Sequence, residues 1–323
     1  MPGPTGTAHA LSIRQLNYLV VLAETLNFTR AAQRCFVTQS TLSAGIQELE
    51  RLLGGVLFER DRQGVRTTSL GLDLAARARL LVSQAVDLVQ TASTAAAPLE
   101  GRVTLGAIPT IAPFLLPRLL RRMRQEFPSL TTLVREERTP ELLRAVEDGD
   151  MDFALIALPM SIGRLRQIPL FTEELWLIAA EGDPLVQQAA PRLAQIEMER
   201  LLLMSEGHCL RDHALHACQS GRRGRRRAPS AIEATSLPTL VQMVEAGLGV
   251  ALLPEMAIKA GFLARTRVIA RPMAAPAPHR QIALIARPST TRGQLLEQIG
   301  HLATPPSPVA GIAGARRRRP GTG

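Results

Sequence analysis

The spacing of apolar residues changes at Pro98, and this change limits the folds open to the chain. Before Pro98, apolar residues recur three and four positions apart, which is the period of amphipathic helices. After it, short apolar runs alternate with helical segments, as in α/β domains built around a sheet. These runs are 102–108, 131–136, 153–158, 175–180, 201–204, 250–253 and 281–286. The pattern predicts an α-helical N-terminal part followed by an α/β part.

The α/β part is expected to contain largely parallel strands in two subdomains. A proline- and alanine-rich segment, Met273–Pro278, precedes the last strand, so the chain is expected to return to the first sheet. One subdomain would then hold residues about 98–172 and 279–303 and the other about 173–278, with a cleft between them. A chain of 323 residues is long enough for two or three domains. The ends, 1–10 and 304–323, are expected to be disordered because their composition cannot build a core.

Residues 11–69 are predicted to form a winged helix-turn-helix domain. Helices are expected at 12–23, 30–34 and 39–52. Thr29 is expected to cap the second helix, Thr38 or Gln39 opens the third, and Gly54 stops it. The apolar runs 56–58 and 65–67 flank a polar turn, which predicts a short hairpin, the wing.

Residues 70–97 are predicted to form one long linker helix. Its leucines and alanines repeat every seven residues, at Leu74, Leu81 and Leu88 and at Ala78, Ala85 and Ala92. Such a seam is typical of helices that pair, and we expect the helix to set the separation of two DNA-reading modules in a dimer. The alternative is an amphipathic helix that packs on its own domain.

The net charge of +10 suggests nucleic-acid binding, but its distribution weakens that reading. Five arginines lie within Arg222–Arg227 and four within Arg316–Arg319, whereas the first hundred residues are close to neutral. DNA binding must therefore be argued from the motif and not from the charge.

The sequence contains no signal for export or for the membrane. No apolar run is long enough to span a bilayer, and residues 1–10 lack the basic and apolar regions of a secretory signal. We therefore expect a cytoplasmic protein without a membrane partner, whose thiols are kept reduced.

Short polar side chains at the start of the third predicted helix are suited to contact base edges and phosphates in the major groove. They are Gln39, Ser40, Thr41 and Ser43. Phosphate contacts are expected from Arg30, Arg62 and Arg66. The simpler interpretation is that these side chains cap the helix or are solvated.

The stretch Phe28–Arg60, FTRAAQRCFVTQSTLSAGIQELERLLGGVLFER, closely resembles the signature of LysR-type regulators. The resemblance extends through the wing, the linker helix and an α/β sensing domain of periplasmic-binding-protein-like architecture. Ser40 stands where the family usually has proline, and Ala44 where many members have arginine. These departures concern base preference and not the module.

Histidine and cysteine are concentrated in 207–218, which holds three of the six histidines and two of the three cysteines. One use is thiol redox sensing, because a cysteine at a helix start has a lowered pKa and is readily oxidised. If Cys209–Cys218 is helical, the sulfurs lie on opposite faces about 13 Å apart along the axis, so a disulfide requires rearrangement. Two alternatives are a metal site, whose spacing matches no standard zinc pattern, and ordinary cysteines in a regulator with another signal.

The segment Glu206–Asp212, with Cys218 nine residues after Cys209, resembles the hydrogen-peroxide-sensing OxyR branch of the LysR family. That resemblance implies that Cys209 is the peroxidatic cysteine and Cys218 the resolving one. It also implies that three side chains hold peroxide and one arginine stabilises the thiolate. These are Thr110, Thr139 and His208, and Arg280. The two threonines have a simpler alternative as caps of the helices that follow them. Cys35 is interpreted as a small core residue.

The resemblance therefore implies a transcriptional regulator of the oxidative-stress response, switched by hydrogen peroxide, and not an enzyme. Its expected partners are double-stranded promoter DNA, a second or further copies in a homodimer or homotetramer, and RNA polymerase. No cofactor or metal is expected. Two alternatives remain: a LysR-type regulator with a small organic effector in the cleft beside Thr110, and a thiol peroxidase that turns over with a reductant.

Overall fold

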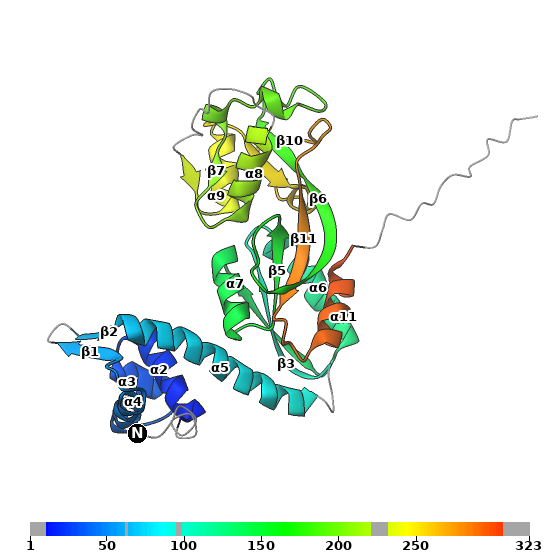
Figure 1. Cartoon of the computed structure of the whole chain (residues 1–323). Helices are drawn as coiled ribbons and strands as arrows, with labels where there is room; N and C mark the ends of the chain where they lie inside the picture. Colours follow the sequence, from blue (N-terminus) through cyan, green and yellow to red (C-terminus); the bar gives the residue numbers. More distant parts are fainter. Residues whose placement is uncertain (1–10, 62–63, 95–98, 221–231, 306–323) are drawn as a thin grey trace, which may run out of the picture.

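The computed structural model describes residues 11–61, 64–94, 99–220 and 232–305. A helical module at the N-terminus is joined by one long helix to an elongated α/β part (Figure 1). The predicted order of architectures is confirmed. The predicted tail beyond Thr304 falls almost wholly outside the described residues. Among these residues, no helix is both long enough and apolar enough to cross a bilayer.

The N-terminal module contains α2 (Ile13–Thr25), α3 (Phe28–Arg34), α4 (Gln39–Leu53) and a hairpin of β1 (Phe58–Asp61) and β2 (Gly64–Thr67). The Thr38 hydroxyl accepts the backbone N–H of Thr41, as expected for the cap of the third helix. Gly54 ends α4 with a φ of 70°, which favours glycine. The predicted helix-turn-helix and its wing are present, with helix ends within a few residues of expectation.

The cap of α3 differs from the prediction. Asn27 accepts the backbone N–H of Arg30 at 3.0 Å, so the helix begins at Phe28. Thr29 lies inside the first turn, and its hydroxyl donates instead to Gln39 Oε1 at 3.2 Å. The expectation that Thr29 caps α3 is wrong, because Asn27 is also a favourable capping residue and lies two positions earlier.

The linker helix α5 (Ser69–Thr94) buries one side and exposes another. Ala78 and Leu74 of the predicted seam pack against the N-terminal module, as the alternative of an amphipathic helix expects. Leu81 and Leu88, further along the seam, are 45% and 74% exposed. Apolar residues exposed along a helix are suited to pairing with a second chain, so the dimer seam stays a prediction. Arg79 connects the module to the α/β part, because it forms ion pairs with Glu24 at 3.1 Å and with Asp148 at 3.5 Å.

The first half of the α/β part is a sheet with helices packed against it. Its strands are β3 (Gly101–Ala107), β4 (Leu130–Glu136), β5 (Phe153–Leu158), β6 (Arg166–Ala180) and β11 (His279–Ala286). Its helices are α6 (Ala112–Glu126), α7 (Thr139–Asp148) and α11 (Gly293–Ala303). Strand β3 runs parallel to β4 and β5, and β11 pairs antiparallel with both β5 and β6. The predicted return of the last strand to the first sheet is confirmed.

The second half extends the sheet along the distal end of β6, which pairs antiparallel with β9 (Ala251–Pro254) and β10 (Val268–Arg271). A small parallel pair, β7 (Leu203–Met204) and β8 (Glu233–Ala234), lies beside helices α8 (Cys209–Ser220), α9 (Leu237–Glu245) and α10 (Glu255–Lys259). The expectation of largely parallel strands is wrong. The long strands β6 and β11 cross between the two halves and run against their neighbours.

Two separate apolar cores result. The first core surrounds Leu105, Phe153 and Leu284, and the second surrounds Leu177 and Leu252. Strands β6 and β11 lie side by side and lead from one core toward the other (Figure 1). This arrangement places the junction of the cores next to the first residues of α8.

Asn27→Ala is expected to lower the stability of the N-terminal module by about 1 kcal/mol, because the N–H of Arg30 loses its acceptor. Calorimetric melting of the full chain should show the transition of this module lowered by about 4–8 °C. Thr29→Ala is the matched control and should lower it less. An effect of Thr29→Ala equal to or larger than that of Asn27→Ala would contradict the assignment of the cap.

Candidate functional site

Helix α8 begins at Cys209, directly after a turn at Gly207 whose φ of 86° favours glycine. Cys209 belongs to the first core and Cys218 to the second, and both side chains are buried. The structure shows neither cysteine in a disulfide. One helix therefore carries two thiols that are packed into different cores.

The structure brings the predicted residues together around Cys209. A pocket there, the Cys209 pocket, is lined by Ile108, Pro109, Thr110, Arg138, Thr139, Gly207, His208 and Cys209. Thr110 follows β3, Thr139 begins α7, and His208 precedes α8. The pocket is too narrow to admit a water-sized molecule. Access to the thiol therefore requires these loops to move.

The two threonines do not cap helices. The N-cap residues of α6 and α7 are Ile111 and Arg138, and neither cap uses a side-chain hydrogen bond. The Thr110 hydroxyl instead accepts Arg280 Nη1 at 2.8 Å. The Thr139 hydroxyl is buried without a hydrogen bond of normal geometry among the described residues, and it lies close enough to influence the thiol. The capping alternative is therefore wrong for both.

Arg280 is fully buried and is held by a carboxylate that the sequence did not point to. Its Nε donates to Glu173 Oε1 at 2.9 Å, and its Nη2 lies 2.8 Å from the same oxygen in an ion pair. The Nη2 also donates to the Thr110 carbonyl at 3.1 Å. Glu173 Oε2 accepts the backbone N–H of Met256, next to the start of α10. Glu173 lies between Thr172 and Glu174 in the sequence, and this pattern does not indicate that it is the partner of Arg280. Only the pairing of β6 with β11 places it opposite Arg280.

Burial raises the pKa of the Cys209 thiol, and this effect exceeds the opposing influence of Arg280 and Thr139. The expectation of a lowered pKa at the helix start is therefore wrong for the closed pocket. The positive charge of Arg280 is paired with Glu173, which limits its effect on the thiol. Arg211, in the first turn of α8, donates to the Met204 carbonyl and to Glu233.

The pKa of His208, which directly precedes α8, lies below its usual value. Burial lowers the pKa of His208, and the charge of Arg138 adds to this. His208 Nε2 has no hydrogen-bond partner among the described residues. Within the same residues, no three histidine, cysteine, aspartate or glutamate side chains gather in a way that could hold a metal ion.

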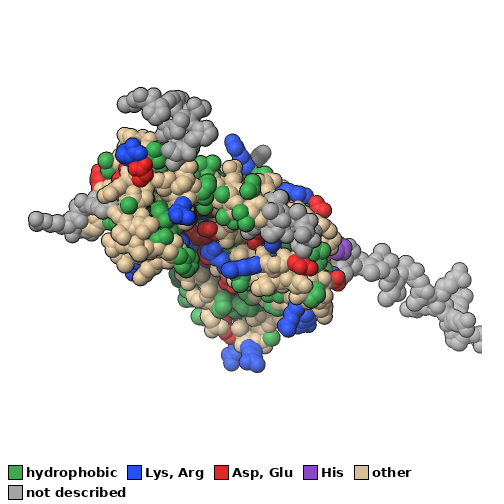
Figure 2. Space-filling model, turned by 90° about the horizontal axis from the view of Figure 1, so that it is seen from below, with side chains coloured by type: hydrophobic (Ala, Val, Ile, Leu, Met, Phe, Trp, Pro, Cys, Tyr) green, Lys and Arg blue, Asp and Glu red, His purple; other side chains and the backbone are tan. Residues whose placement is uncertain are grey.

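The predicted DNA-contacting side chains that the structure describes lie on α3, in the first turns of α4 and on the wing strand β2. Arg30, Gln39, Ser40, Thr41 and Arg66 are exposed, and Ser43 is half-buried. Arg62 lies outside the described residues. Basic side chains on the lower face of the molecule stand at separate places and do not form one patch (Figure 2). The start of α4 is thus exposed to solvent and available to DNA.

Two family models match the chain. Residues 13–72 match the bacterial regulatory helix-turn-helix protein, LysR family, and residues 96–303 match the LysR substrate binding domain. Together they cover most of the described residues.

Relatives include two differently named regulators. The chain is 46% identical over 279 residues to the transcriptional regulator EstR of Acinetobacter baylyi, covering 86% of this chain and 91% of that protein. It is 36% identical over 289 residues to the transcriptional dual regulator OxyR of Escherichia coli, covering 90% and 93%.

Solved structures that match the chain include OxyR proteins. A full-length OxyR variant from Pseudomonas aeruginosa matches with a TM-score of 0.74 at 32% identity, covering 91% of this chain and 94% of that one. A Corynebacterium glutamicum OxyR mutant with hydrogen peroxide bound matches with a TM-score of 0.62 at 31% identity, covering 90% and 91%. The two-subdomain fold is therefore shared with OxyR structures.

Arg280→Gln and Glu173→Gln are expected to move the pKa of Cys209 in opposite directions. The first removes a positive charge and should raise it, whereas the second leaves Arg280 unpaired and should lower it, each by about one pH unit. The Cys209 pKa of each variant is measured by following the ultraviolet absorbance of the thiolate against pH, in chains whose other cysteines are replaced by serine. Glu174→Gln, an exposed neighbour on β6, is the control and should change little. Shifts of the same sign in the first two variants would refute the assigned electrostatics.

Proposed function

The chain belongs to the LysR family of transcriptional regulators, and from this membership we propose that hydrogen peroxide switches it through Cys209 and Cys218. The site residues named above carry the switch, and the start of α4 reads promoter DNA. The regulator is expected to act in the cytoplasm, where that DNA lies. The names and structures of the OxyR relatives support this proposal.

One observation carries the proposal: the two thiols lie near opposite ends of one helix and pack into different cores. Nine residues of helix separate them by about 13 Å along the axis, whereas a disulfide needs Cα atoms within about 7 Å. Forming the bond therefore requires α8 to unwind or move. Oxidation of one thiol thereby changes how α8 packs against the two cores.

The chemistry balances with peroxide as the oxidant. The Cys209 thiolate attacks one peroxide oxygen, the O–O bond breaks, and sulfenic acid and hydroxide form; the hydroxide takes a proton to become water. The Cys218 sulfur then attacks the sulfenic sulfur, the S–S bond forms, and a second water leaves. Peroxide is reduced to two waters, and the two thiols are oxidised to one disulfide.

The side chains around Cys209 have distinct roles in this proposal. Thr110, Thr139 and His208 hold peroxide beside the sulfur once the pocket opens. Arg280 stabilises the thiolate, which is the reactive form. Because burial keeps the thiol protonated while the pocket is closed, opening the pocket and activating the thiol are coupled.

Signal transfer to DNA runs through the subunit assembly. A homodimer or homotetramer, paired through α5, presents its α4 helices to successive major grooves. Rearrangement of α8 shifts the subunit interface and with it the spacing of the DNA-reading modules. The resulting change in the DNA contacts alters how RNA polymerase transcribes antioxidant genes.

A second candidate is a regulator that answers to a small organic effector. The relative EstR, which is not named for peroxide, favours it. The expected location beside Thr110 favours it less, because the closed Cys209 pocket would have to open wider for an organic effector than for the smaller peroxide. A thiol peroxidase is the weaker alternative, because an enzyme has no need of a helix-turn-helix module.

Cys209→Ser should retain DNA binding and lose the peroxide response, because no sulfenic acid can form at this position. Peptide mass mapping after about one equivalent of peroxide should detect a Cys209–Cys218 disulfide in the natural protein and none in the variant. Cys218→Ser should instead accumulate sulfenic acid on Cys209. Cys35→Ser is the control and should form the disulfide normally. A peroxide-responsive Cys209→Ser protein would refute the redox switch.

Gln39→Ala is expected to reduce the preference of the protein for its own promoter DNA by about 1–3 kcal/mol, the worth of one bidentate base contact. Fluorescence anisotropy at a fixed salt concentration, against promoter and scrambled duplexes, gives both affinities. Gln47→Ala, an exposed glutamine two turns further along α4, is the matched control and should change neither affinity. Equal losses in the two variants would argue against base contact by Gln39.

A further inference from the structure

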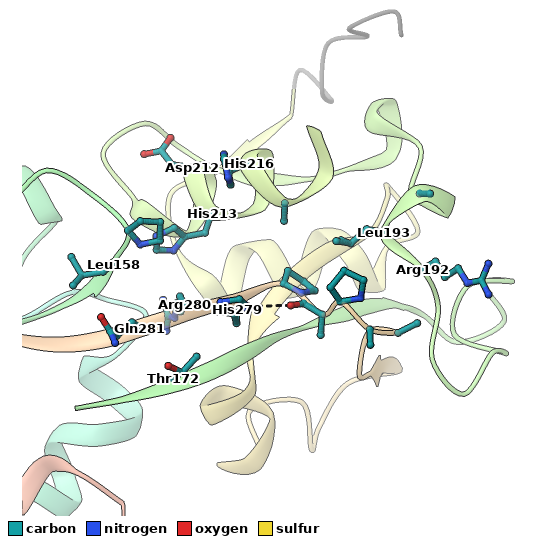
Figure 3. A pocket seen from close by; sticks show the side chains of 18 residues that line it. Leu158, Thr172, Arg192, Leu193, Asp212, His213, His216, His279, Arg280 and Gln281 are labelled. Carbon is teal, nitrogen blue, oxygen red and sulfur yellow. Dashed lines mark hydrogen bonds between the residues drawn. The ribbon is translucent and has the colours of Figure 1, made fainter. Parts of the chain in front are cut away.

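A second cavity, much larger than the Cys209 pocket, lies beside α8. It has a volume of about 1040 Å³ and is bounded by α8 and by the segment 274–278 before β11 (Figure 3). This volume is at the upper end of the range of small-molecule sites. None of its described lining residues belongs to the Cys209 pocket, so the two are separate sites.

The cavity wall is mainly apolar, and polar side chains such as Thr172, Asp212 and His279 interrupt it. Leu158, Leu193 and Pro276 contribute apolar walls. Figure 3 places His213 and Leu158 toward one end and the exposed Arg192 at the other. Apolar walls with a few polar groups at defined positions are characteristic of sites that orient an organic ligand.

His213 points to a ligand because it is buried without a hydrogen-bond partner among the described residues. Its side chain is 7% exposed, and neither ring nitrogen makes a hydrogen bond of normal geometry among the described residues. Burial lowers the pKa of His213 to about 4, and the positive charge of Arg280 adds to this effect. The backbone of Pro159 acts in the opposite direction, although it forms no hydrogen bond of normal geometry with the ring. A neutral imidazole offers one donor and one acceptor, which together match a hydroxyl group. Buried polar groups of this kind are normally satisfied.

We propose that this cavity, the α8 cavity, binds an aromatic hydroxy acid. The hydroxyl pairs with His213, the ring packs between Leu158 and the segment 274–278, and the carboxylate lies near Arg192. Arg280 is not available to the carboxylate in the same way, because its guanidinium is already held by Glu173 and Thr110.

Binding in the α8 cavity would oppose the redox switch. Four lining residues, Asp212, His213, His216 and Ala217, lie on α8 between the two cysteines. A ligand that contacts them as a helix binds the reduced state better than a state in which α8 has rearranged. By linkage it must then disfavour the disulfide to the same extent. This coupling rests on the proposed function, whereas the binding itself does not.

Binding is tested by calorimetric titration of the reduced full chain with 4-hydroxyphenylacetate. Saturable binding at one site is expected, and phenylacetate, which lacks the hydroxyl, should bind about tenfold more weakly. His213→Leu should cause a similar loss, and Ala277→Phe should abolish binding by filling the cavity. His301→Leu, an exposed histidine on α11, is the matched control. No saturable binding in the low millimolar range, or equal binding by all variants, would overturn the proposal.

The coupling is tested by following disulfide formation by mass spectrometry after one equivalent of peroxide. With 4-hydroxyphenylacetate bound, disulfide formation should slow in proportion to site occupancy, and sulfenic acid on Cys209 should last longer. His213→Leu should form the disulfide at a rate independent of the compound. An unchanged rate in the saturated natural protein would overturn the coupling. If no disulfide forms under any condition, the redox function is refuted. The calorimetric titration would still decide whether the α8 cavity binds the compound.

Discussion

The guanidinium of Arg280 lies without solvent exposure where the two cores of the α/β part meet, and Glu173 and Thr110 hold it there. Removing one partner of such a buried pair costs about 3–5 kcal/mol, because the other charge is left uncompensated. The pair joins β11 to β6, and the second oxygen of Glu173 reaches the backbone at Met256. The position of the loop that carries Thr110, and therefore the shape of the Cys209 pocket, depends on this ion pair.

The same ion pair also affects the pKa of the Cys209 thiol. Burial in the first core raises the pKa of Cys209, while Arg280, partly neutralised by Glu173, lowers it less. In the proposed switch, a thiol in this state is shielded from general oxidants and reacts when the pocket opens. Cys218 lies in the second core, so the proposed disulfide also requires α8 to rearrange.

Ion pairs on the linker helix α5 connect the DNA-reading module to the α/β part. Arg79 on α5 pairs with Glu24 of the DNA-reading module and with Asp148 at the end of α7, whose first residue is Thr139. Helix α7 therefore contributes to the Cys209 pocket at one end and touches the linker helix at the other. Its position allows it to transmit a rearrangement around Cys209 to α5, whose exposed leucines are suited to a partner chain.

Sequence by itself determined what depends on short-range physics: the helix that Thr38 caps and Gly54 ends, the buried strands of the sheet, and two thiols nine residues apart on one helix. Even locally it misjudged Thr29, because Asn27 nearby caps equally well. Only the tertiary structure decided the direction of the Cys209 pKa, the partnership of Arg280 with Glu173 and the α8 cavity. Glu173 and Thr110 lie 107 and 170 residues from Arg280, so only strand pairing and burial bring these charges together.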